Sequence, residues 1–275
     1  VILKHARIVT GTSLAIEKLF AAALPENVFQ SIIADSALAG AMIRSKYIDA
    51  VSLTGSVKAG ESVAAKAGKN LKKVVLELGG SDPFVVLEDA DLELTCKGAI
   101  RSRLRNAGQS CVAAKRFIVV KSIADEFTRR FVESIQKLKI GDPLDPETDV
   151  GPLSSAQQRD IIEQQVNDSV KAGAKVLIGG KRREGKGYFY EPTVLADVKN
   201  NMRVVKEETF GPVAPIVIVK DERAAVKEAN NTDLGLGASV WTSNREKGEK
   251  IARQLQAGIV TVNRMVTSDI KMPFG

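Results

Sequence analysis

The sequence predicts an α/β fold in two parts, a partial doubly wound sheet in residues 1–80 and a second α/β domain in residues 81–275. The first observation behind this prediction is that short apolar runs alternate with helical patterns, which is typical of parallel, doubly wound sheets. The second is the glycine pair Gly79-Gly80, which follows an apolar run and marks the boundary. The third is size, because 275 residues of which 44% are hydrophobic supply a core for one large or two ordinary domains.

In the first part, each expected strand is a short apolar run and each expected helix has a helical period. Thr12 or Ser13 is expected to cap the first helix, with Glu17 in its first turns. The expected strands are residues 1–3, 28–33, 50–53 and 72–78, and the expected helices are residues 13–23, 37–45 and a stretch that opens in the turn 54–60 and ends near residue 67.

The second part repeats the α/β rhythm without an internal repeat. Its residues 123–138 are strongly amphipathic, which predicts a helix with one buried face. Proline and glycine predict loops at 141–146 and 181–188. The expected helices are residues 91–104, 123–138, 154–172, 222–230 and 244–256, and the expected strands are residues 117–120, 175–178, 215–220, 237–241 and 259–263.

The composition argues against several classes of function. Two cysteines point to a reducing compartment, so a cytoplasmic location is expected, and a single histidine, His5, argues against a metal site. The net charge is +7, but the basic residues are spread among acidic ones and only 5% of residues are aromatic, so no nucleic-acid partner is expected. No apolar run is long enough to span a bilayer, so no membrane partner is expected either.

Cys111 lies on a glycine-interrupted turn of small residues, 105–113, between an expected helix and an expected strand. A cysteine at such a junction can be held rigidly with its sulfur open to a cleft, as a nucleophile requires. Most free cysteines are instead buried packing groups, and that is the interpretation for Cys96 inside the preceding helix. The turn makes Cys111 a candidate nucleophile and leaves a packing role open.

Two further stretches are candidates for chemistry. Glu77 ends an apolar run, and because an unpaired buried carboxylate is costly, it is expected to meet a cation or to stand beside a cleft as a general base. Gly55, Ser56 and Gly60 form a turn that opens a helix, whose free N–H groups suit an anion. The spacing differs from the G-x-G-x-x-G fingerprint, so a turn or packing role for these glycines is an equal alternative.

Five motifs in register resemble the aldehyde dehydrogenase superfamily over essentially the whole chain. Segments 4–6, 78–84 and 113–117 look most like its NAD(P)-dependent succinate-semialdehyde dehydrogenase group. The five motifs are Leu53-Thr54-Gly55-Ser56 with Gly60, Leu76-Glu77-Leu78-Gly79-Gly80, Gly108-Gln109-Ser110-Cys111, Glu207-Glu208-Thr209-Phe210-Gly211-Pro212 and Pro273-Phe274-Gly275.

The resemblance implies an NAD(P)-dependent oxidation of an aldehyde, either succinate semialdehyde or a similar short aldehyde, to the carboxylic acid. Cys111 matches the nucleophile, which would form a thiohemiacetal and then a thioester, with its own backbone N–H at the oxyanion. Glu77 matches the base that activates water against the thioester. The expected cofactor is NADP or NAD, with a Rossmann-like domain in residues 1–80 and the nucleophile in residues 81–275.

Resemblance also assigns the cofactor contacts. Lys4 matches a lysine at the adenosine ribose, and Glu208 matches a carboxylate at the nicotinamide ribose. Arg7 stands where many NAD-preferring relatives have a glutamate, and because a guanidinium suits a 2′-phosphate, NADP is expected to be accepted at least as well as NAD. The expected cofactor set is Lys4, Arg7, Gly55, Ser56, Gly60, Leu78, Glu208 and Phe210.

The chain departs from the family pattern at both ends. The Pro-Trp-Asn motif that supplies a second oxyanion donor would precede Lys4, and segments that join subunits would lie upstream and after the Pro-Phe-Gly motif. A truncated chain is therefore expected, with a homo-oligomer, either a dimer or a tetramer, for the full chain. A truncated and catalytically incompetent member of the fold is an open alternative.

Two alternative enzyme functions are disfavoured, and the resemblance also indicates where the substrate would be contacted. A CoA-acylating aldehyde dehydrogenase is disfavoured because Glu77 is present, and a cysteine hydrolase is disfavoured because the resemblance puts His5 at the cofactor end. By resemblance, Arg264 and Ser268 border the substrate funnel. Arg264 is expected either to pair with a substrate carboxylate or to be an ordinary surface arginine.

Overall fold

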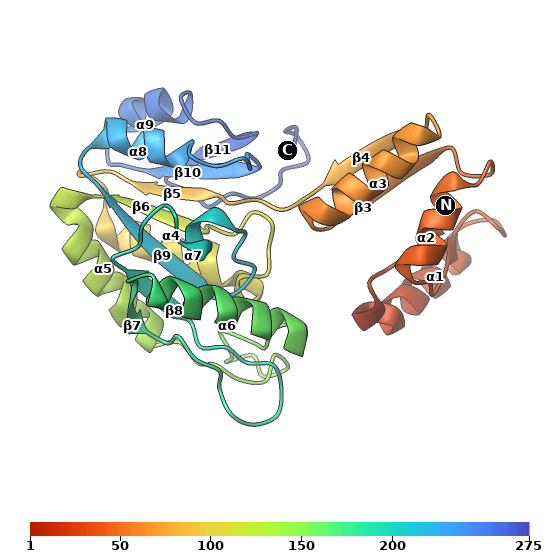
Figure 1. Ribbon diagram of the computed structural model, residues 1–275, viewed down its shortest axis with the longest axis horizontal. Coiled ribbons are helices and arrows are strands. Elements are labelled where there is room, and N and C mark those ends of the chain that lie inside the picture. Colours follow the sequence, from red (N-terminus) through yellow and green to blue (C-terminus); the bar gives the residue numbers. More distant parts are fainter. Residues whose placement is uncertain (275) are drawn as a thin grey trace. The chain divides into compact units, whose positions relative to one another are not determined.

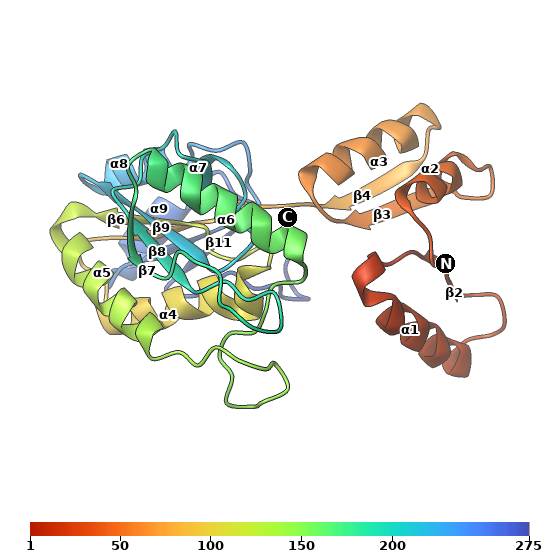
Figure 2. The ribbon, with the colours of Figure 1, turned by 60° about the horizontal axis from the view of Figure 1, so that its bottom comes forward.

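The computed structural model describes residues 1–274, and Gly275, the last residue of the Pro-Phe-Gly motif, lies outside the described part. The chain divides into two compact units, unit 1 spanning Val1–Leu78 and unit 2 beginning at Gly79. Figures 1 and 2 show helices and strands alternating along both units. The predicted α/β class is confirmed.

Unit 1 holds four strands in two separate parallel pairs, β1 with β2 and β3 with β4. Helix α3 packs on β3 and β4, α2 packs on α3, and α1 packs on β2. The elements are β1 (Ile2–Leu3), the 3₁₀ turn η1 (Arg7–Val9), α1 (Thr10–Ala23), β2 (Gln30–Ser31), α2 (Ser36–Arg44), β3 (Ala50–Thr54), α3 (Val57–Lys69) and β4 (Lys73–Glu77).

The first helix corrects one prediction. It begins at Thr10 rather than near residue 13, and Ser13 is a buried residue inside it whose hydroxyl hydrogen-bonds to that of Ser31. The hydroxyl of Thr10 donates to the carbonyl of Arg7 at 2.9 Å, which ties the helix to the turn before it. The expected strand 28–33 is also shorter, because only Gln30 and Ser31 pair with β1.

Unit 2 carries most of the buried side chains of the described chain. Its elements are β5 (Pro83–Val86), α4 (Leu92–Leu104), the 3₁₀ turn η2 (Arg105–Gly108), β6 (Arg116–Val120), α5 (Lys121–Gln136), α6 (Ala156–Lys171), β7 (Lys175–Ile178), β8 (Thr193–Ala196), α7 (Arg203–Lys206), β9 (Val213–Val219), α8 (Glu222–Ala229), β10 (Gly237–Trp241), α9 (Arg245–Ala252) and β11 (Ile259–Val262).

A seven-stranded sheet in the order β11-β10-β5-β6-β9-β8-β7 forms the centre of unit 2. Its neighbouring strands are parallel, except that β7 runs antiparallel to β8. Phe117 and Val119 of β6 belong to one core cluster, whereas Ile118 and Val120 belong to the other. This alternation, together with Figures 1 and 2, shows a sheet covered on one face by α4 and α5 and on the other by α8 and α9.

The sequence analysis missed two strands of this sheet, β5 and β8. Each is four residues long, begins at or directly after a proline and lacks a long apolar run, so its pattern is weak in isolation. Strand β5 nevertheless lies between β10 and β6, and its residues are buried on both faces. Pairing with β10 and β6 stabilises β5 as a strand, and the local sequence does not show this pairing.

Among residues 1–274, no helix is long and apolar enough to cross a membrane.

Candidate active site

The turn that carries Cys111 follows directly from the end of α4 at Leu104. Asn106 and Ala107 each have φ near 53°, and Gly108 has φ of 75°, so three successive residues adopt a left-handed conformation. Such a conformation is costly for Ala107 and free for Gly108. A Cβ on Gly108 would also lie only 2.3 Å from the carbonyl oxygen of Gly211, so this position requires glycine.

Side chains within the turn close it on itself. The Gln109 amide nitrogen donates to the carbonyl of Asn106 at 3.1 Å, and the Asn106 amide donates to the carbonyl of Gln109 at 3.0 Å. The Gln109 amide oxygen accepts the N–H of Ser154 at 2.8 Å, which ties the turn to the segment before α6. A backbone held in this way gives Cys111 a fixed position.

Arg103, in the last turn of α4, adds a buried cation behind the turn. Its Nη2 donates to the carbonyl of Gly108 at 2.7 Å and to that of Thr209 at 3.3 Å. Burial lowers the pKa of Arg103, although a guanidinium remains charged at neutral pH. This arginine therefore connects the turn that carries Cys111 to the segment that carries Glu208.

The two cysteines lie in different environments. Cys111 is half-buried, whereas Cys96, on α4, is buried in the core. Burial raises the pKa of the Cys96 thiol to about 11, so at neutral pH this thiol is protonated and inert. The packing role predicted for Cys96 is confirmed, and Cys111 is the accessible thiol of the chain.

Glu208 lies against the start of unit 2. The N–H of Gly80 donates to Glu208 Oε1 at 3.2 Å, and Lys115 Nζ lies 3.5 Å from the same oxygen. The neighbouring Glu207 has a different role, because Arg203 donates to both of its carboxylate oxygens at 2.7 and 2.9 Å. The two adjacent carboxylates thus have different partners, Arg203 for Glu207 and Lys115, beside the Cys111 turn, for Glu208.

Phe210, two residues further on, is half-buried, and its carbonyl accepts the Gln158 amide at 2.8 Å. Gln165, also on α6, donates to the carbonyl of Glu208 at 3.2 Å. Helix α6 therefore fixes the backbone of the segment that holds both Glu208 and Phe210.

In unit 1, Glu77 is the last residue of β4, in register with Thr54 of β3. Its carboxylate is half-buried, and within Val1–Leu78 no cation lies at ion-pair distance from it. Of the two alternatives for Glu77, a cation partner and a strand end, the strand end is therefore the one observed. The carbonyl of Glu77 accepts the N–H of Gly55 at 2.9 Å. The candidate base and the candidate pyrophosphate turn are therefore joined by their backbones.

The turn before α3 begins with Gly55 and Ser56. Ser56 is the N-cap of α3, and its hydroxyl accepts the N–H of Ala59 at 3.3 Å. The N–H groups of Val57 and Lys58 have no intrahelical acceptor, as at any helix start. Gly60 in the first turn is required by packing, because a Cβ there would lie 2.5 Å from the Leu78 side chain.

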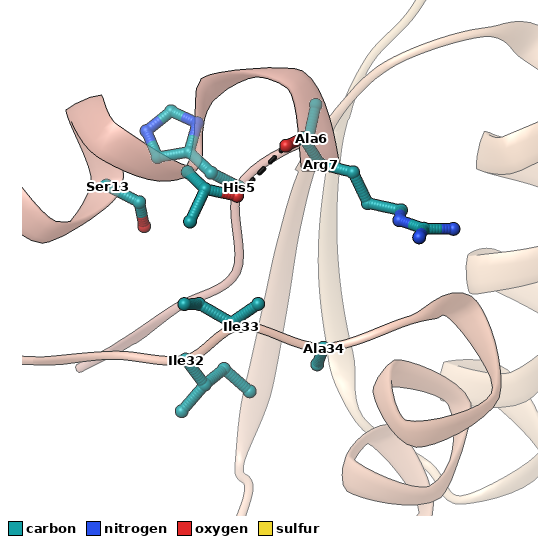
Figure 3. A pocket seen from close by; sticks show the side chains of 8 residues that line it. His5, Ala6, Arg7, Ser13, Ile32, Ile33 and Ala34 are labelled. Atoms are coloured by element: carbon teal, nitrogen blue, oxygen red, sulfur yellow. Dashed lines mark hydrogen bonds between the residues drawn. The ribbon is translucent and has the colours of Figure 1, made fainter.

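Of the N-terminal cofactor candidates, Arg7 lines a small cavity. Lys4 and Arg7 are exposed, on either side of the half-buried His5. The cavity, of about 10 Å³, has room for little more than a water molecule, and it is lined by residues 5–7, Thr10, Ser13 and residues 32–34. In Figure 3 the guanidinium of Arg7 points away from the side chains of His5 and Ser13. Arg7 thus presents its charge outward from the rim.

Arg264 lines a larger pocket of about 330 Å³ between α4 and the segment after β11. Three cations, Lys97, Arg101 and Arg264, line it, and no carboxylate does. Ser268 is exposed and does not belong to this lining. The pocket lining consists of Leu94, Lys97, Gly98, Arg101, Trp241, Asn263, Arg264, Met265 and Thr267.

The structure brings some of the predicted residues together and leaves others apart. Cys111 and Glu208 meet in unit 2 through Lys115, whereas Glu77 and the N-terminal cofactor candidates belong to unit 1, so their approach to Cys111 stays a prediction. The sequence analysis did not identify Arg103 or Lys115 as members of the site. The signal for Lys115 was present, because a charge at the start of an apolar strand needs a buried partner, as was argued for Glu77.

Comparison with known proteins identifies relatives along the whole chain. A family model described as the aldehyde dehydrogenase family matches residues 1–275. The chain is 45% identical to the succinate semialdehyde dehydrogenase [NAD(P)+] Sad of Escherichia coli (strain K12), over all of this chain and 60% of that protein. It is 44% identical to the succinate-semialdehyde dehydrogenase [NADP(+)] of Mycobacterium avium (strain 104), over all of this chain and 58% of that protein.

Solved structures agree with these matches. The succinic semialdehyde dehydrogenase from Streptococcus pyogenes in complex with NADP+ superposes with a TM-score of 0.96 at 37% identity, covering all of this chain and 60% of that one. The structure of Gox0499 superposes with a TM-score of 0.97 at 42% identity, covering all of this chain and 60% of that one. The chain thus spans about 60% of the length of the relatives that it matches.

Proposed function

This chain belongs to the aldehyde dehydrogenase family, and we propose that the protein carrying it oxidises a short aldehyde, succinate semialdehyde in the first instance, to the carboxylic acid with NADP or NAD. The names of the relatives from Escherichia coli and Mycobacterium avium support this choice of substrate and cofactor. Because the chain spans about 60% of those relatives, the activity is proposed for the whole protein.

The observation that carries the proposal is the setting of Cys111, the accessible thiol on a turn that Arg103, Gln109 and Lys115 hold by its backbone. The Cys111 thiolate would attack the aldehyde carbon, forming a C–S bond and a thiohemiacetal. A bound nicotinamide would supply the hydride acceptor, and loss of hydride from the thiohemiacetal carbon would leave a thioester on Cys111. Glu77 would take a proton from water, which attacks the thioester and releases the acid and the free thiol.

The residues present fit a dinucleotide cofactor. In unit 1, Ser56 caps α3, and the backbone N–H groups of Val57 and Lys58 at the start of this helix have no intrahelical acceptor. Such free N–H groups suit a pyrophosphate. In unit 2, the missing side chain of Gly79 makes room for the Glu208 carboxylate, since a Cβ there would lie 2.2 Å from Glu208 Oε2. A carboxylate accessible from one side is suited to accept hydrogen bonds from ribose hydroxyls.

For the substrate, we propose that Arg264 attracts its carboxylate. Arg264 shares its pocket with Lys97 and Arg101, and Lys97 is already paired with Glu93 at 2.7 Å. We expect Arg264→Ala to raise the KM for succinate semialdehyde more than that for an uncharged aldehyde of equal length. Arg223→Ala, which removes an exposed arginine from α8 on the other face of the sheet, is the control. An equal effect of Arg264→Ala on both aldehydes would remove the carboxylate contact.

The proposed order of steps has a direct test in Glu77→Gln. With the base removed, the thioester should accumulate, so intact-protein mass spectrometry of this variant after mixing with aldehyde and NADP should show one acyl group on Cys111. The double variant Glu77→Gln/Cys111→Ser should show none. A Glu77→Gln enzyme that turns over normally, or a wild type that releases product only when CoA is added, contradicts the hydrolytic mechanism, and the second result supports a CoA-acylating enzyme instead.

A further inference from the structure

Lys115 is a fully buried lysine that contacts the backbone of the nucleophile turn. It lies four residues after Cys111 and directly before β6, and its side chain has no exposed surface. Its ammonium donates to the carbonyls of Ser110 at 3.0 Å, Cys111 at 2.6 Å and Ala113 at 3.3 Å. An ammonium has three donors, and here all of them are directed at the turn.

The same ammonium faces a carboxylate from a distant part of the sequence. Lys115 Nζ lies 3.5 Å from Oε1 of Glu208, the oxygen that also accepts the N–H of Gly80. A single buried charge therefore contacts both the backbone of the proposed nucleophile and the side chain proposed to hold the nicotinamide ribose. Arg103 also contacts the Cys111 turn and the segment of Glu208, but only through backbone carbonyls. Among the described residues, no cation other than Lys115 contacts both the carbonyls of this turn and the Glu208 carboxylate.

Apolar packing alone does not explain a charge at this position. Burying an ammonium costs several kcal/mol, and apolar residues of similar volume commonly stabilise a core as well or better. The titratable groups that face Lys115 are Asp82, Arg103, Glu208 and the Cys111 thiol. Burial lowers the pKa of Lys115, and the carboxylates of Asp82 and Glu208 oppose that shift. The positive charge of Lys115 is thus kept near the Cys111 thiol although desolvation disfavours it.

We propose that Lys115 is a positioning residue, which holds the Cys111 turn in its reactive setting and couples that setting to Glu208. The inference rests on the proposed function, because it takes Cys111 as the nucleophile and Glu208 as a cofactor contact. When the hydroxyl groups of a ligand donate hydrogen bonds to Glu208 Oε1, the carboxylate offsets less of the positive charge of the Lys115 ammonium. That charge then acts more strongly on the Cys111 thiolate. Cofactor binding would thereby raise the reactivity of the thiol.

The test measures the rate at which iodoacetamide alkylates Cys111 in the intact protein, resolved by mass spectrometry, with and without NADP. Lys115→Met, which keeps length and removes charge, should slow this alkylation by about tenfold, the size expected for a lost charged contact. The acceleration by NADP should disappear in the same variant. Buried Cys96 serves as the internal control and should stay unmodified in each folded sample.

The alkylation rate of Cys111 in Glu208→Gln is a second test, which does not depend on the folding of the Lys115 variant. Because the ammonium then loses its carboxylate, alkylation of Cys111 without NADP should become faster, opposite in direction to Lys115→Met. The matched control is Glu207→Gln, whose carboxylate pairs with Arg203 and not with Lys115. In the double variant Lys115→Met/Glu208→Gln, the acceleration should be lost.

The outcomes separate this inference from the proposed function. Equal alkylation rates in Glu208→Gln and Glu207→Gln, or a folded Lys115→Met with a wild-type rate and a wild-type response to NADP, overturn the role of Lys115 and leave the proposed function intact. Full aldehyde oxidation by Cys111→Ser overturns the proposed function itself. A lower melting temperature of Lys115→Met with unchanged Cys111 chemistry shows a structural role only and also overturns the inference.

Discussion

A methyl group on Gly79 would lie 2.2 Å from Oε2 of Glu208, although 129 positions separate the two residues in the sequence (208 minus 79). Gly80 donates its N–H to the other oxygen of the same carboxylate. The glycine pair therefore does more than end a strand. It provides a backbone surface against which the Glu208 side chain lies, and it leaves no space for a side chain of its own.

We predict that Gly79→Ala weakens NADP binding with little loss of stability. The added methyl group displaces a half-buried, flexible carboxylate rather than backbone, so the side chain moves and its ribose hydrogen bonds are lost. Because hydrogen bonds to charged groups contribute about 1.5–3 kcal/mol, the dissociation constant should rise by about tenfold or more. Titration of the intact protein with NADP measures it. Gly68→Ala, which has no atom within 4 Å of the new methyl group, should bind NADP normally. Similar affinities for both variants would remove Glu208 from the cofactor site.

Arg7→Glu tests the cofactor preference. The exposed guanidinium is expected to pair with the 2′-phosphate of NADP, so reversing its charge should lower kcat/KM with NADP by about tenfold or more and leave that with NAD unchanged or higher. Steady-state kinetics with both cofactors measure the ratio. Arg44→Glu, an exposed charge reversal on α2, is the control for a general loss of surface charge. An unchanged NADP/NAD ratio in Arg7→Glu would exclude the contact.

Gly60→Ala should destabilise the protein by about 1–3 kcal/mol, as overpacking in a filled site does. The new methyl group would lie 2.5 Å from both terminal carbons of Leu78, so Leu78 has to move. Chemical denaturation of the intact protein measures the free energy of unfolding. Gly68→Ala in the same helix should instead stabilise it, by up to about 1 kcal/mol, because alanine is the better helix former. Adding Leu78→Ala should relieve the clash in Gly60→Ala, and a destabilisation that persists unchanged would show that packing against Leu78 is not its cause.

Asp82 makes stability depend on pH with a definite sign. Burial raises its pKa to about 7, and the Gly237 N–H and the Lys115 and Arg116 charges oppose that shift. Between the unfolded pKa of about 3.9 and the folded pKa, the folded chain retains a proton that the unfolded chain releases, so this group's contribution to stability falls as pH rises.

We therefore expect Asp82→Asn to reduce the loss of unfolding free energy between about pH 5 and about pH 8. Asparagine keeps an oxygen for the Gly237 N–H, so the fold should tolerate the change. Denaturant titrations at both pH values measure the difference, with Asp233→Asn as the exposed control. A wild-type pH dependence in Asp82→Asn would show that Asp82 does not titrate in this range.

The sequence predicted the α/β class and most helices, because periods of apolar residues are local. It also predicted Cys111 on a turn, and for Glu77 it left open a cation partner or a strand end beside a cleft, of which the strand end is observed. It missed β5, whose four residues become a central strand only through β6 and β10. It likewise missed Arg103 and Lys115. A charge before an apolar strand indicated that Lys115 needs a buried partner, but the partners are carbonyl groups that no residue type announces. Contacts to backbone carbonyls were therefore beyond prediction, whereas the turn itself was not.

The most direct test of the central claim compares the two cysteines. NADPH formation by the intact protein with succinate semialdehyde and NADP should be abolished by Cys111→Ser, because this removes the nucleophile. It should be nearly unaffected by Cys96→Ser in any sample that remains folded, because that thiol is buried and protonated. Turnover retained by Cys111→Ser, or lost equally in folded Cys96→Ser, would contradict the assignment of Cys111 as the nucleophile.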